Sequence, residues 1–283
     1  METVLITGTS SGIGRATALH LVGRGYRVLA GVRDRNDGVS LESEAPTGGD
    51  LVPMLLDVTD RSAIDAAVKR AKAVADEDGL VAVVNNAGQP VAGPMEVLPL
   101  DELRRELEVN LVGQVAVTQA FLPMLRASEG RVIFVTSIGG RVVLPFAGAY
   151  YASKFGLEAV AEAMRTELEG SGVMVSTIEP GVTDSEIWRK AEEQSEELLD
   201  GLPAPQRKLY EADMQQFRGR LRSARDDDTM PPEKVAETIE RAITARHPST
   251  RYPVGAPARV AARIRPFVPD RIWDKLARRP FSG

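Results

Sequence analysis

Short apolar runs alternate with longer amphipathic segments along most of this chain. The apolar runs predict buried strands over residues 3–7, 27–32, 51–56, 81–84, 131–136 and 173–178. Between them, apolar residues at i, i+3 and i+4 spacing predict helices over residues 12–23, 62–76, 101–125 and 150–169. This alternation predicts an α/β fold, a doubly wound parallel β-sheet with helices on both faces. Ligands bind such sheets at the carboxyl ends of the strands.

The pattern changes after Gly181. Residues 184–230 are rich in Glu, Gln and Arg, and apolar side chains are scattered among them. These apolar positions include Trp188, Leu198, Leu199, Met214 and Phe217. Spaced apolar residues in a charged sequence predict amphipathic helices. The helices are either a lid inserted over a substrate site or a solvent-facing pair with no part in binding.

The last part of the chain predicts one more helix, one more strand and a basic tail. Pro231 and Pro232 begin a helix that runs to about Arg246, and residues 250–254 predict the strand. In the tail, residues 256–283, Arg and Lys outnumber Asp and alternate with apolar side chains. A basic amphipathic tail can lie on a membrane or pack against protein. We expect it to pack on its own domain or on a neighbouring protomer.

The composition favours one folded domain with this architecture. A single α/β domain commonly fills 283 residues, and a hydrophobic content of 43% provides for a substantial core. The net charge of −5 gives no overall attraction to nucleic acid or to an anionic membrane. We therefore expect neither as a partner.

Three features concern the cellular compartment. The absence of cysteine excludes disulfides and thiol catalysis, and it is compatible with a reducing compartment. The chain enters its first strand directly, without the basic and apolar regions of a signal peptide. No apolar run approaches the ~20 residues that span a bilayer. The sequence predicts a cytoplasmic protein without a transmembrane segment.

A glycine-rich turn follows the first predicted strand. Its candidate ligand-binding residues are Gly8, Ser10, Ser11, Gly12, Ile13 and Gly14. Glycine permits a tight bend and a close approach of the backbone to a ligand, and the following helix N-terminus presents N–H groups and a positive dipole. A pyrophosphate suits such a turn, which therefore predicts a dinucleotide site. The spacing is Gly-x-x-x-Gly-x-Gly, not the Gly-x-Gly-x-x-Gly of the long-chain fingerprint.

A serine, a tyrosine and a lysine form the second candidate site. Tyr150 and Lys154 are four residues apart in a predicted helix, so they share one face, and Ser137 follows a predicted strand. A nearby ammonium favours the ionised phenol, and moving a phenol pKa from about 10 toward neutrality requires ~4 kcal/mol. The pair suits acid–base catalysis. Tyr151, three residues before Lys154, also fits that face. Neither histidine falls in a plausible site, and no cluster has metal-ligand spacing.

These motifs, with Asn85-Asn86-Ala87-Gly88 and Pro180-Gly181, resemble the short-chain dehydrogenase/reductase family over about residues 4–183. The resemblance implies a Rossmann-like fold, a nicotinamide cofactor and hydride transfer. It selects Tyr150 over Tyr151 as the proton-transfer residue. It also implies that Ser137 binds the substrate oxygen and that Lys154 binds the nicotinamide ribose and lowers the tyrosine pKa.

The resemblance implies roles for further residues. Asn110 matches the family's fourth catalytic member, which holds a water of the proton relay, although it can also be read as an ordinary polar helix residue. The implied cofactor contacts are Asp57 and Val58 at the adenine, Asn86, Ala87 and Gly88 beside the nicotinamide ribose, and Pro180, Gly181 and Thr183 near the carboxamide. We expect Asn85, more than Asn86, to bond backbone in a tight turn.

The end of the second predicted strand discriminates between the two nicotinamide cofactors. By resemblance, the acid of NAD enzymes would stand at position 32, which is Val, and the basic residue of NADP enzymes follows at Arg33. We therefore expect NADP(H). Asp34 is one residue late for the ribose of NAD, yet a small register shift would admit it, and Ser11 occupies a turn position that is often basic in NADP enzymes. NAD(H) stays the alternative.

The resemblance is greatest to the branch of 17β-hydroxysteroid and retinol dehydrogenases. It implies hydride transfer between NADP(H) and an alcohol/carbonyl pair, with a bulky apolar substrate such as a steroid, a retinoid or a long-chain ketone or aldehyde. The alternatives are an acyl or polyketide ketoreductase and, in another class, a dinucleotide-sensing protein without turnover. The family also implies a homodimer or homotetramer through helices 101–125 and 150–169.

Overall fold

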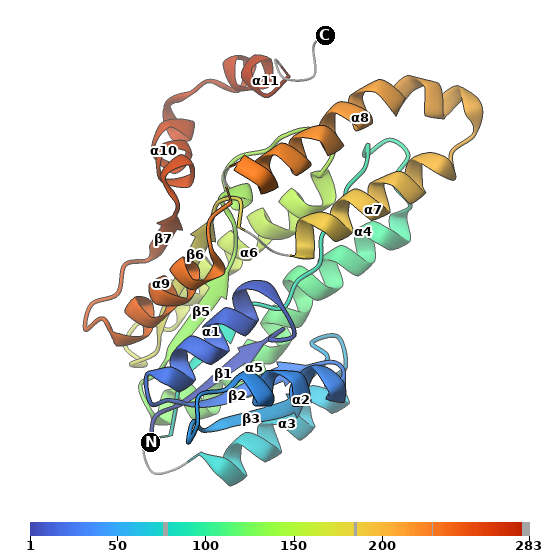
Figure 1. The fold of residues 1–283 in the computed structure, drawn as a ribbon. Helices are drawn as coiled ribbons and strands as arrows, with labels where there is room; N and C mark the ends of the chain where they lie inside the picture. The colour runs from blue at the N-terminus through green and yellow to red at the C-terminus, as the bar shows by residue number, and fades with distance from the viewer. Residues whose placement is uncertain (76–78, 184–185, 228, 279–283) are drawn as a thin grey trace.

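A parallel β-sheet forms the centre of the protein (Figure 1). The structure is a computed structural model that describes residues 1–75, 79–183, 186–227 and 229–278. Over these residues the sheet has seven strands in the order β3-β2-β1-β4-β5-β6-β7. The strands are β1 (Thr3–Thr7), β2 (Arg27–Val32), β3 (Leu51–Leu55), β4 (Leu80–Asn85), β5 (Arg131–Val135), β6 (Met174–Pro180) and β7 (Arg251–Val254). The predicted fold class, a doubly wound parallel sheet, is confirmed.

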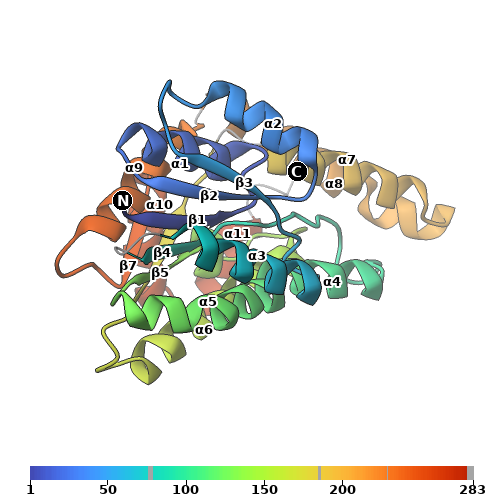
Figure 2. The same ribbon diagram turned by 90° about the horizontal axis from the view of Figure 1, so that it is seen from below.

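Helices cover both faces of this sheet (Figure 2). One layer contains α1 (Gly12–Gly23), α2 (Arg35–Glu44) and α9 (Pro232–Thr244). The other contains α3 (Arg61–Val74), α5 (Gly113–Ala127) and α6 (Gly148–Glu167). Helix α4 (Leu100–Leu107) lies on this same side and packs against α6 (Figure 2). Both faces of the strands are therefore buried, which explains the continuous apolar runs in the sequence. In β1, Val4 and Ile6 pack toward α1 and α9, whereas Leu5 packs toward α3 and α5.

The strand order places the ligand site. The chain moves outward from β1 to β3 on one side, then returns to β4 and moves outward to β7 on the other. The carboxyl ends of β1 and β4 lie at this reversal, where the connections leave in opposite directions. Such a switch point opens a crevice for a ligand.

The predicted helix over residues 101–125 is interrupted. The structure has α4, then a π-helical segment from Glu108 to Val112, then α5. Asn110 lies at the centre of the π-helical segment. A π-bulge of this kind adds one residue to a turn of an α-helix, and such bulges are frequent at functional sites. The sequence analysis predicts one uninterrupted helix here, because apolar residues at helical spacing lie on both sides of the segment.

Helix α2 has no counterpart among the predicted elements. It is largely polar, so it lacks the apolar periodicity on which the prediction of helices rests. The Asp34 carboxylate caps its first turn and accepts a hydrogen bond from the Asn36 backbone N–H at 2.7 Å. This cap, rather than hydrophobic patterning, marks the start of the helix.

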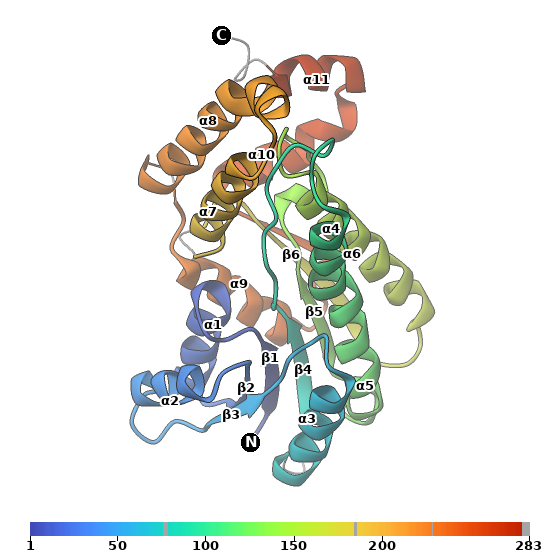
Figure 3. The same cartoon turned by 90° about the vertical axis from the view of Figure 1, so that its right-hand side faces the viewer.

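Two helices, α7 (Glu186–Asp200) and α8 (Ala204–Asp227), make up most of the predicted insertion and extend beyond the sheet (Figure 3). Its ends are joined, because Thr183 forms a β-bridge with Met230 and the Met230 N–H donates to the Val182 carbonyl at 3.1 Å. Of this insertion, residues 184, 185 and 228 lie outside the described residues, as do Asp76 of the helix predicted over residues 62–76 and the last five residues of the tail.

The basic tail forms α10 (Ala256–Ile264), a 3-10 turn (Arg265–Phe267) and α11 (Asp270–Arg278). Ala258 and Ala262 of α10 are buried. The Trp273 indole N–H of α11 donates to the Val143 carbonyl at 3.1 Å. The described part of the tail thus packs along its own chain, near the loop that follows β5, while several of its apolar side chains stay exposed.

Candidate active site

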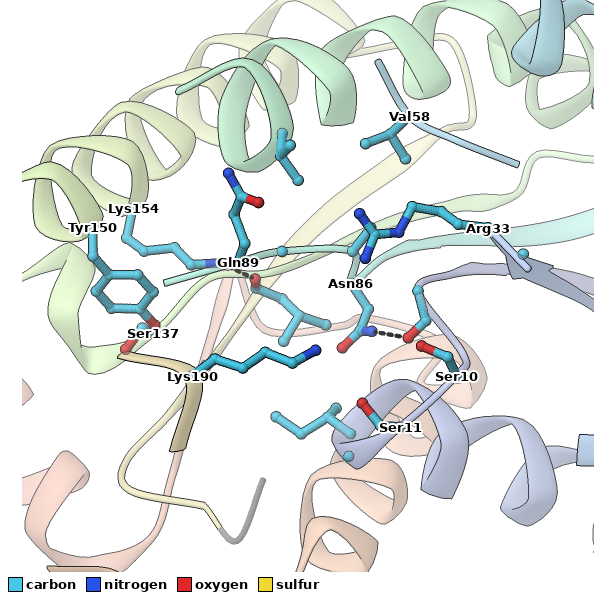
Figure 4. Close-up of a pocket in the computed structure, with 18 of the residues that line it drawn as sticks. Ser10, Ser11, Arg33, Val58, Asn86, Gln89, Ser137, Tyr150, Lys154 and Lys190 are labelled. Carbon is cyan, nitrogen blue, oxygen red and sulfur yellow. Dashed lines mark hydrogen bonds between the residues drawn. The ribbon is translucent and has the colours of Figure 1, made fainter. Parts of the chain in front are cut away.

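A cleft of about 470 Å³ opens at the carboxyl ends of the strands (Figure 4). Arg33 and Ser10 lie toward one end of it, Ser137, Tyr150 and Lys154 lie at the other, and Asn86 lies between them. Among the predicted site residues, the structure brings the following to the cleft wall: Gly8, Ser10, Ser11, Gly12, Ile13, Arg33, Asp57, Val58, Asn86, Ala87, Gly88, Ser137, Tyr150, Lys154, Pro180, Gly181 and Thr183. The wall does not include Gly14 and Asn110, which lie behind it.

The glycines of the turn after β1 are required by close packing. Gly8 has φ +69°, and a Cβ there would lie 2.7 Å from Ala87 Cα. A Cβ at Gly14 would lie 2.1 Å from the Gly8 carbonyl oxygen and 2.5 Å from Asn86 Nδ2. The turn therefore folds tightly under β4, and the N-terminus of α1 faces the cleft. This cradle fits the pyrophosphate of a dinucleotide, because a helix N-terminus presents unpaired N–H groups and a positive dipole to an anion.

Gly14→Ala is expected to disrupt this turn. The added methyl group cannot be accommodated without moving the Gly8 backbone, so we expect about 1–3 kcal/mol of destabilisation and at least a tenfold loss of cofactor affinity. Gly23→Ala in the same helix is the matched control, because its Cβ would meet only Pro46 Cγ at 3.9 Å. Thermal unfolding and cofactor titration of both variants check this. Equal cofactor affinity in the two variants would contradict the role of the turn.

The two asparagines at the end of β4 and directly after it differ from the expectation. Asn86, not Asn85, bonds the backbone of a turn, because its Nδ2 donates to the carbonyls of Thr7 and Gly8, both at 3.0 Å. Asn85 is buried, and its Nδ2 donates to Thr118 Oγ1 at 2.8 Å. The assignment of the turn role to Asn85 was wrong, because Asn85 still belongs to β4 and points into the helix layer. Asn86 fastens β4 to the glycine-rich turn.

Ser137, Tyr150 and Lys154 converge at the inner end of the cleft. Tyr150 and Lys154 lie one turn apart on α6, and the Lys154 Nζ is 5.7 Å from the centre of the Tyr150 ring. The Lys154 ammonium donates to the Val135 carbonyl at 3.1 Å. A side-chain hydrogen bond links Ser137 to Tyr150, and the Ser137 hydroxyl also accepts from the Gly139 N–H at 2.9 Å. All three side chains are more than nine-tenths buried.

Burial raises the pKa of Tyr150 above its ordinary value, and only the Ser137 hydrogen bond opposes this. This is opposite to the direction expected from the Tyr–Lys spacing. The reason is geometric, because the ammonium lies over the ring and bonds a backbone carbonyl rather than the phenol oxygen. The protein alone therefore favours the protonated tyrosine, the form that can donate a proton.

Tyr151 takes another position. It does not line the cleft. Its hydroxyl bonds the Leu144 backbone, and burial raises its pKa to about 12. Its ring packs against Gly139, where a Cβ would lie 3.0 Å from the ring carbons. Tyr151 thus has a packing role, and Tyr150 is the tyrosine at the cleft.

Asn110 is fully buried and joins three elements. Its amide exchanges two hydrogen bonds with the backbone of Gln89, both at 2.8 Å. Its Nδ2 also donates to Glu106 Oε1 at 2.6 Å and approaches Ser153 Oγ at 3.3 Å. These bonds hold the loop after β4 against the π-helical segment and α6.

The comparisons with known proteins agree with this geometry. A family model described as "short chain dehydrogenase" matches residues 2–196 of the chain. The protein is a short-chain dehydrogenase. The resemblance on which the sequence analysis relied is confirmed, and the family makes this protein a nicotinamide-dependent oxidoreductase that acts on an alcohol or carbonyl group.

Full-length relatives of this short-chain dehydrogenase are known. The chain is 34% identical to an NADPH-dependent 3-dehydrocapnine reductase of Ornithobacterium rhinotracheale, over 98% of this chain and 96% of that protein. It is 36% identical to retinol dehydrogenase 5 of Mus musculus, over 96% of this chain and 86% of that protein. A crystal structure of a short-chain dehydrogenase from Streptomyces avermitilis superposes with a TM-score of 0.75, at 26% identity, over 98% of this chain and 97% of that one.

Helix α7 adds residues to the short-chain dehydrogenase site. Trp188, which the sequence analysis named only as an apolar position of the possible lid, lines the cleft. Lys190, which it did not name, lines the cleft as well and extends toward Asn86 and Ser11 (Figure 4). Gln89 and Arg105 line it as well. In the sequence, nothing distinguishes Lys190 from the other charged residues of this polar segment. Its place in the site follows only from the position of α7 over the cleft. The sequence could have indicated Glu106, because it lies four residues before Asn110 in a predicted helix and so shares a face with it.

Proposed function

We propose that this protein transfers hydride between NADP(H) and a bulky apolar alcohol or carbonyl compound, such as a steroid, a retinoid or a long-chain ketone or aldehyde. The choice of NADP(H) rests on the different positions of two neighbouring side chains. Arg33 lines the cleft at the end of β2, whereas the Asp34 carboxylate caps α2.

A guanidinium in this position suits the 2′-phosphate of NADP(H). The residue before it, Val32, is buried and offers no carboxylate to a ribose hydroxyl. The Asp34 carboxylate already accepts the Asn36 N–H at 2.7 Å and is not part of the cleft wall. The name of the NADPH-dependent reductase from Ornithobacterium rhinotracheale supports the same choice.

The residues around the cleft fit such a cofactor. The turn from Gly8 to Gly14 would hold the pyrophosphate, Asp57 and Val58 the adenine end, and Asn86 to Gly88 with Thr183 the nicotinamide end. When bound, the nicotinamide supplies or accepts the hydride. Lys190 reaches the middle of the cleft from α7, where an ammonium would meet the pyrophosphate.

The inner residues supply the acid–base chemistry. Ser137 Oγ would donate a hydrogen bond to the substrate oxygen as negative charge develops on it. Tyr150 would give its proton to that oxygen in reduction and take it back in oxidation. Lys154 would bond the nicotinamide ribose and compensate the charge on the phenolate. The hydrogen bond between Ser137 and Tyr150 in the protein alone pre-organises this arrangement.

The helices of the insertion support an apolar substrate. Ala191, Leu199, Met214 and Phe217 form a buried apolar cluster with Ala92, against which Phe146 and Trp188 pack. The Trp188 ring lies edge-on to Tyr150, with ring centres 6.0 Å apart. An aromatic wall beside the catalytic phenol favours a bulky apolar group in the substrate. The name of the relative retinol dehydrogenase 5 agrees with such a class.

Trp188→Ala is expected to raise the KM for a bulky apolar carbonyl compound by about tenfold, because part of the apolar contact area is lost. The KM for a small aldehyde and the dissociation constant of NADPH should change less than twofold. Trp273→Ala in α11, which does not line the cleft, is the control. A similar KM increase in both variants would argue against a lid that contacts substrate.

The proposed function is tested by measuring NADPH and NADH oxidation in parallel, with steroid, retinal and long-chain carbonyl compounds. We expect oxidation of NADPH with at least one class, at a kcat/KM at least tenfold above that with NADH. Activity only on acyl thioesters would favour the ketoreductase alternative. NADPH binding without turnover on any substrate would favour a sensor.

We also propose a homodimer or homotetramer assembled through α4, the π-helical segment, α5 and α6, as the family implies. The exposure of apolar side chains along these elements supports this, with Leu100 63%, Val112 47% and Phe155 42% exposed. A cytoplasmic location stays a prediction from the sequence. Among the described residues no helix is long and apolar enough to cross a membrane.

A further inference from the structure

A carboxyl group is buried beside Asn110, behind the cleft wall. Glu106 of α4 is 0% exposed and lies one turn before Asn110. Its Oε1 accepts a hydrogen bond from Asn110 Nδ2 at 2.6 Å and from the Ser153 hydroxyl at 3.5 Å. Its Oε2 is also buried and has no hydrogen-bond partner within the described part of the chain. A carboxyl group in this situation is costly unless an opposite charge compensates it.

The compensating charge is the catalytic lysine. Of the charged groups that act on Glu106, Lys154 of α6 has the largest effect, ahead of Arg105 and Glu102 on Glu106's own helix. Conversely, Glu106 is the carboxyl group with the largest effect on Lys154, ahead of Glu158. Glu106 also acts on the Tyr150 phenol. The remaining polar groups against it are the Asn110 amide and the Ser153 hydroxyl.

We propose that Glu106 is a positioning residue that fixes Asn110 and keeps Lys154 and Tyr150 protonated on the alkaline side of the activity range. The inference rests on the proposed catalytic roles of these two residues. Through Oε1, the carboxyl group holds the Asn110 amide in the orientation that bonds Gln89. Through its charge, it stabilises the ammonium of Lys154 and disfavours the phenolate of Tyr150.

The electrostatics of the pair agree with this role. Burial raises the pKa of Glu106 to about 8 and lowers the pKa of Lys154 to about 8, and their mutual attraction opposes both effects. As the pH rises, Glu106 can lose its proton in place of Lys154. The resulting carboxylate then retains the proton on Lys154 and raises the pKa of Tyr150.

Replacing the carboxyl group by an amide tests the proposal. In Glu106→Gln, an oxygen stays available to Asn110 while the charge is lost, so the pKa values of both Lys154 and Tyr150 fall. Carbonyl reduction needs both groups protonated. The alkaline limb of the pH profile of kcat/KM should therefore move to lower pH by about one unit. Asp101→Asn, on the same helix in an exposed pair with Arg104, should leave the profile unchanged.

A merely structural role gives a different result. Glu106→Gln would then lower the melting temperature and scale activity equally at all pH values, without moving the alkaline limb. That outcome would overturn the proposal.

A second readout does not depend on turnover. Titration of ¹³Cε-labelled lysine by NMR, with the Lys154 signal assigned by its loss in Lys154→Met, gives the pKa of Lys154 directly. We expect a lower pKa in Glu106→Gln than in the unsubstituted protein, whether or not a substrate has been found. An unchanged pKa would refute the proposal even in an active enzyme, and a lowered pKa in an inactive protein would leave it standing while the proposed function fails.

Discussion

Tyr150→Phe should lower kcat for carbonyl reduction by about 10²–10⁴-fold, the range typical for loss of a general acid. The phenol is the group beside Ser137 at the inner end of the cleft, and burial keeps it protonated. Phenylalanine preserves the ring contact with Trp188 but cannot donate a proton. NADPH affinity should change less than about threefold, because the substitution removes no charge. Steady-state kinetics and a fluorescence titration of NADPH measure both quantities.

Tyr151→Phe is the matched control. The Tyr151 hydroxyl bonds the Leu144 backbone away from the cleft, so its loss should cost at most about 1 kcal/mol of stability and leave most of the activity. If Tyr151→Phe abolished turnover and Tyr150→Phe did not, the assignment of the catalytic tyrosine would be wrong.

Arg33→Ala should raise the KM for NADPH by about 10–100-fold while changing the KM for NADH less than about twofold. A charge-assisted hydrogen bond contributes about 1.5–3 kcal/mol, and NADH has no 2′-phosphate to receive it. The measurement is KM for each cofactor at saturating carbonyl substrate. Equal losses for the two cofactors would refute the role of Arg33.

Two neighbouring substitutions sharpen this test. Arg35→Ala removes an exposed guanidinium that does not line the cleft, so both KM values should stay unchanged. Asp34→Ala removes the cap of α2 and should cost about 1 kcal/mol of stability without altering the use of NADH. A selective loss of NADH use in Asp34→Ala would instead assign the ribose contact to Asp34.

The sheet could be predicted because its strands are buried on both faces. Their continuous apolar runs stand out from the amphipathic helices, and most predicted boundaries lie within two residues of those observed. Helix α2 was missed because it is polar and its start depends on the Asp34 cap. The π-helical segment at Asn110 was missed because one inserted residue barely alters apolar periodicity.

The sequence predicted the parts of the site that are formed by short motifs. The glycine-rich turn, Asn86-Ala87-Gly88 and Tyr150 with Lys154 all reach the cleft wall. Residues contributed by tertiary packing were not predictable in this way. Trp188 and Lys190 enter the site only because α7 folds over it, and the pKa of Tyr150 depends on burial that no spacing encodes.

In the proposed reaction, a hydride passes from NADPH to a carbonyl carbon. The most direct test incubates the purified protein with NADPH that carries deuterium at both positions of nicotinamide C4 and with a carbonyl compound that supports NADPH oxidation. Mass spectrometry then locates deuterium in the product. We predict one deuterium on the carbinol carbon, formed by the unsubstituted protein and not by Tyr150→Phe. Alcohol without deuterium, or equal product from both proteins, would contradict this account.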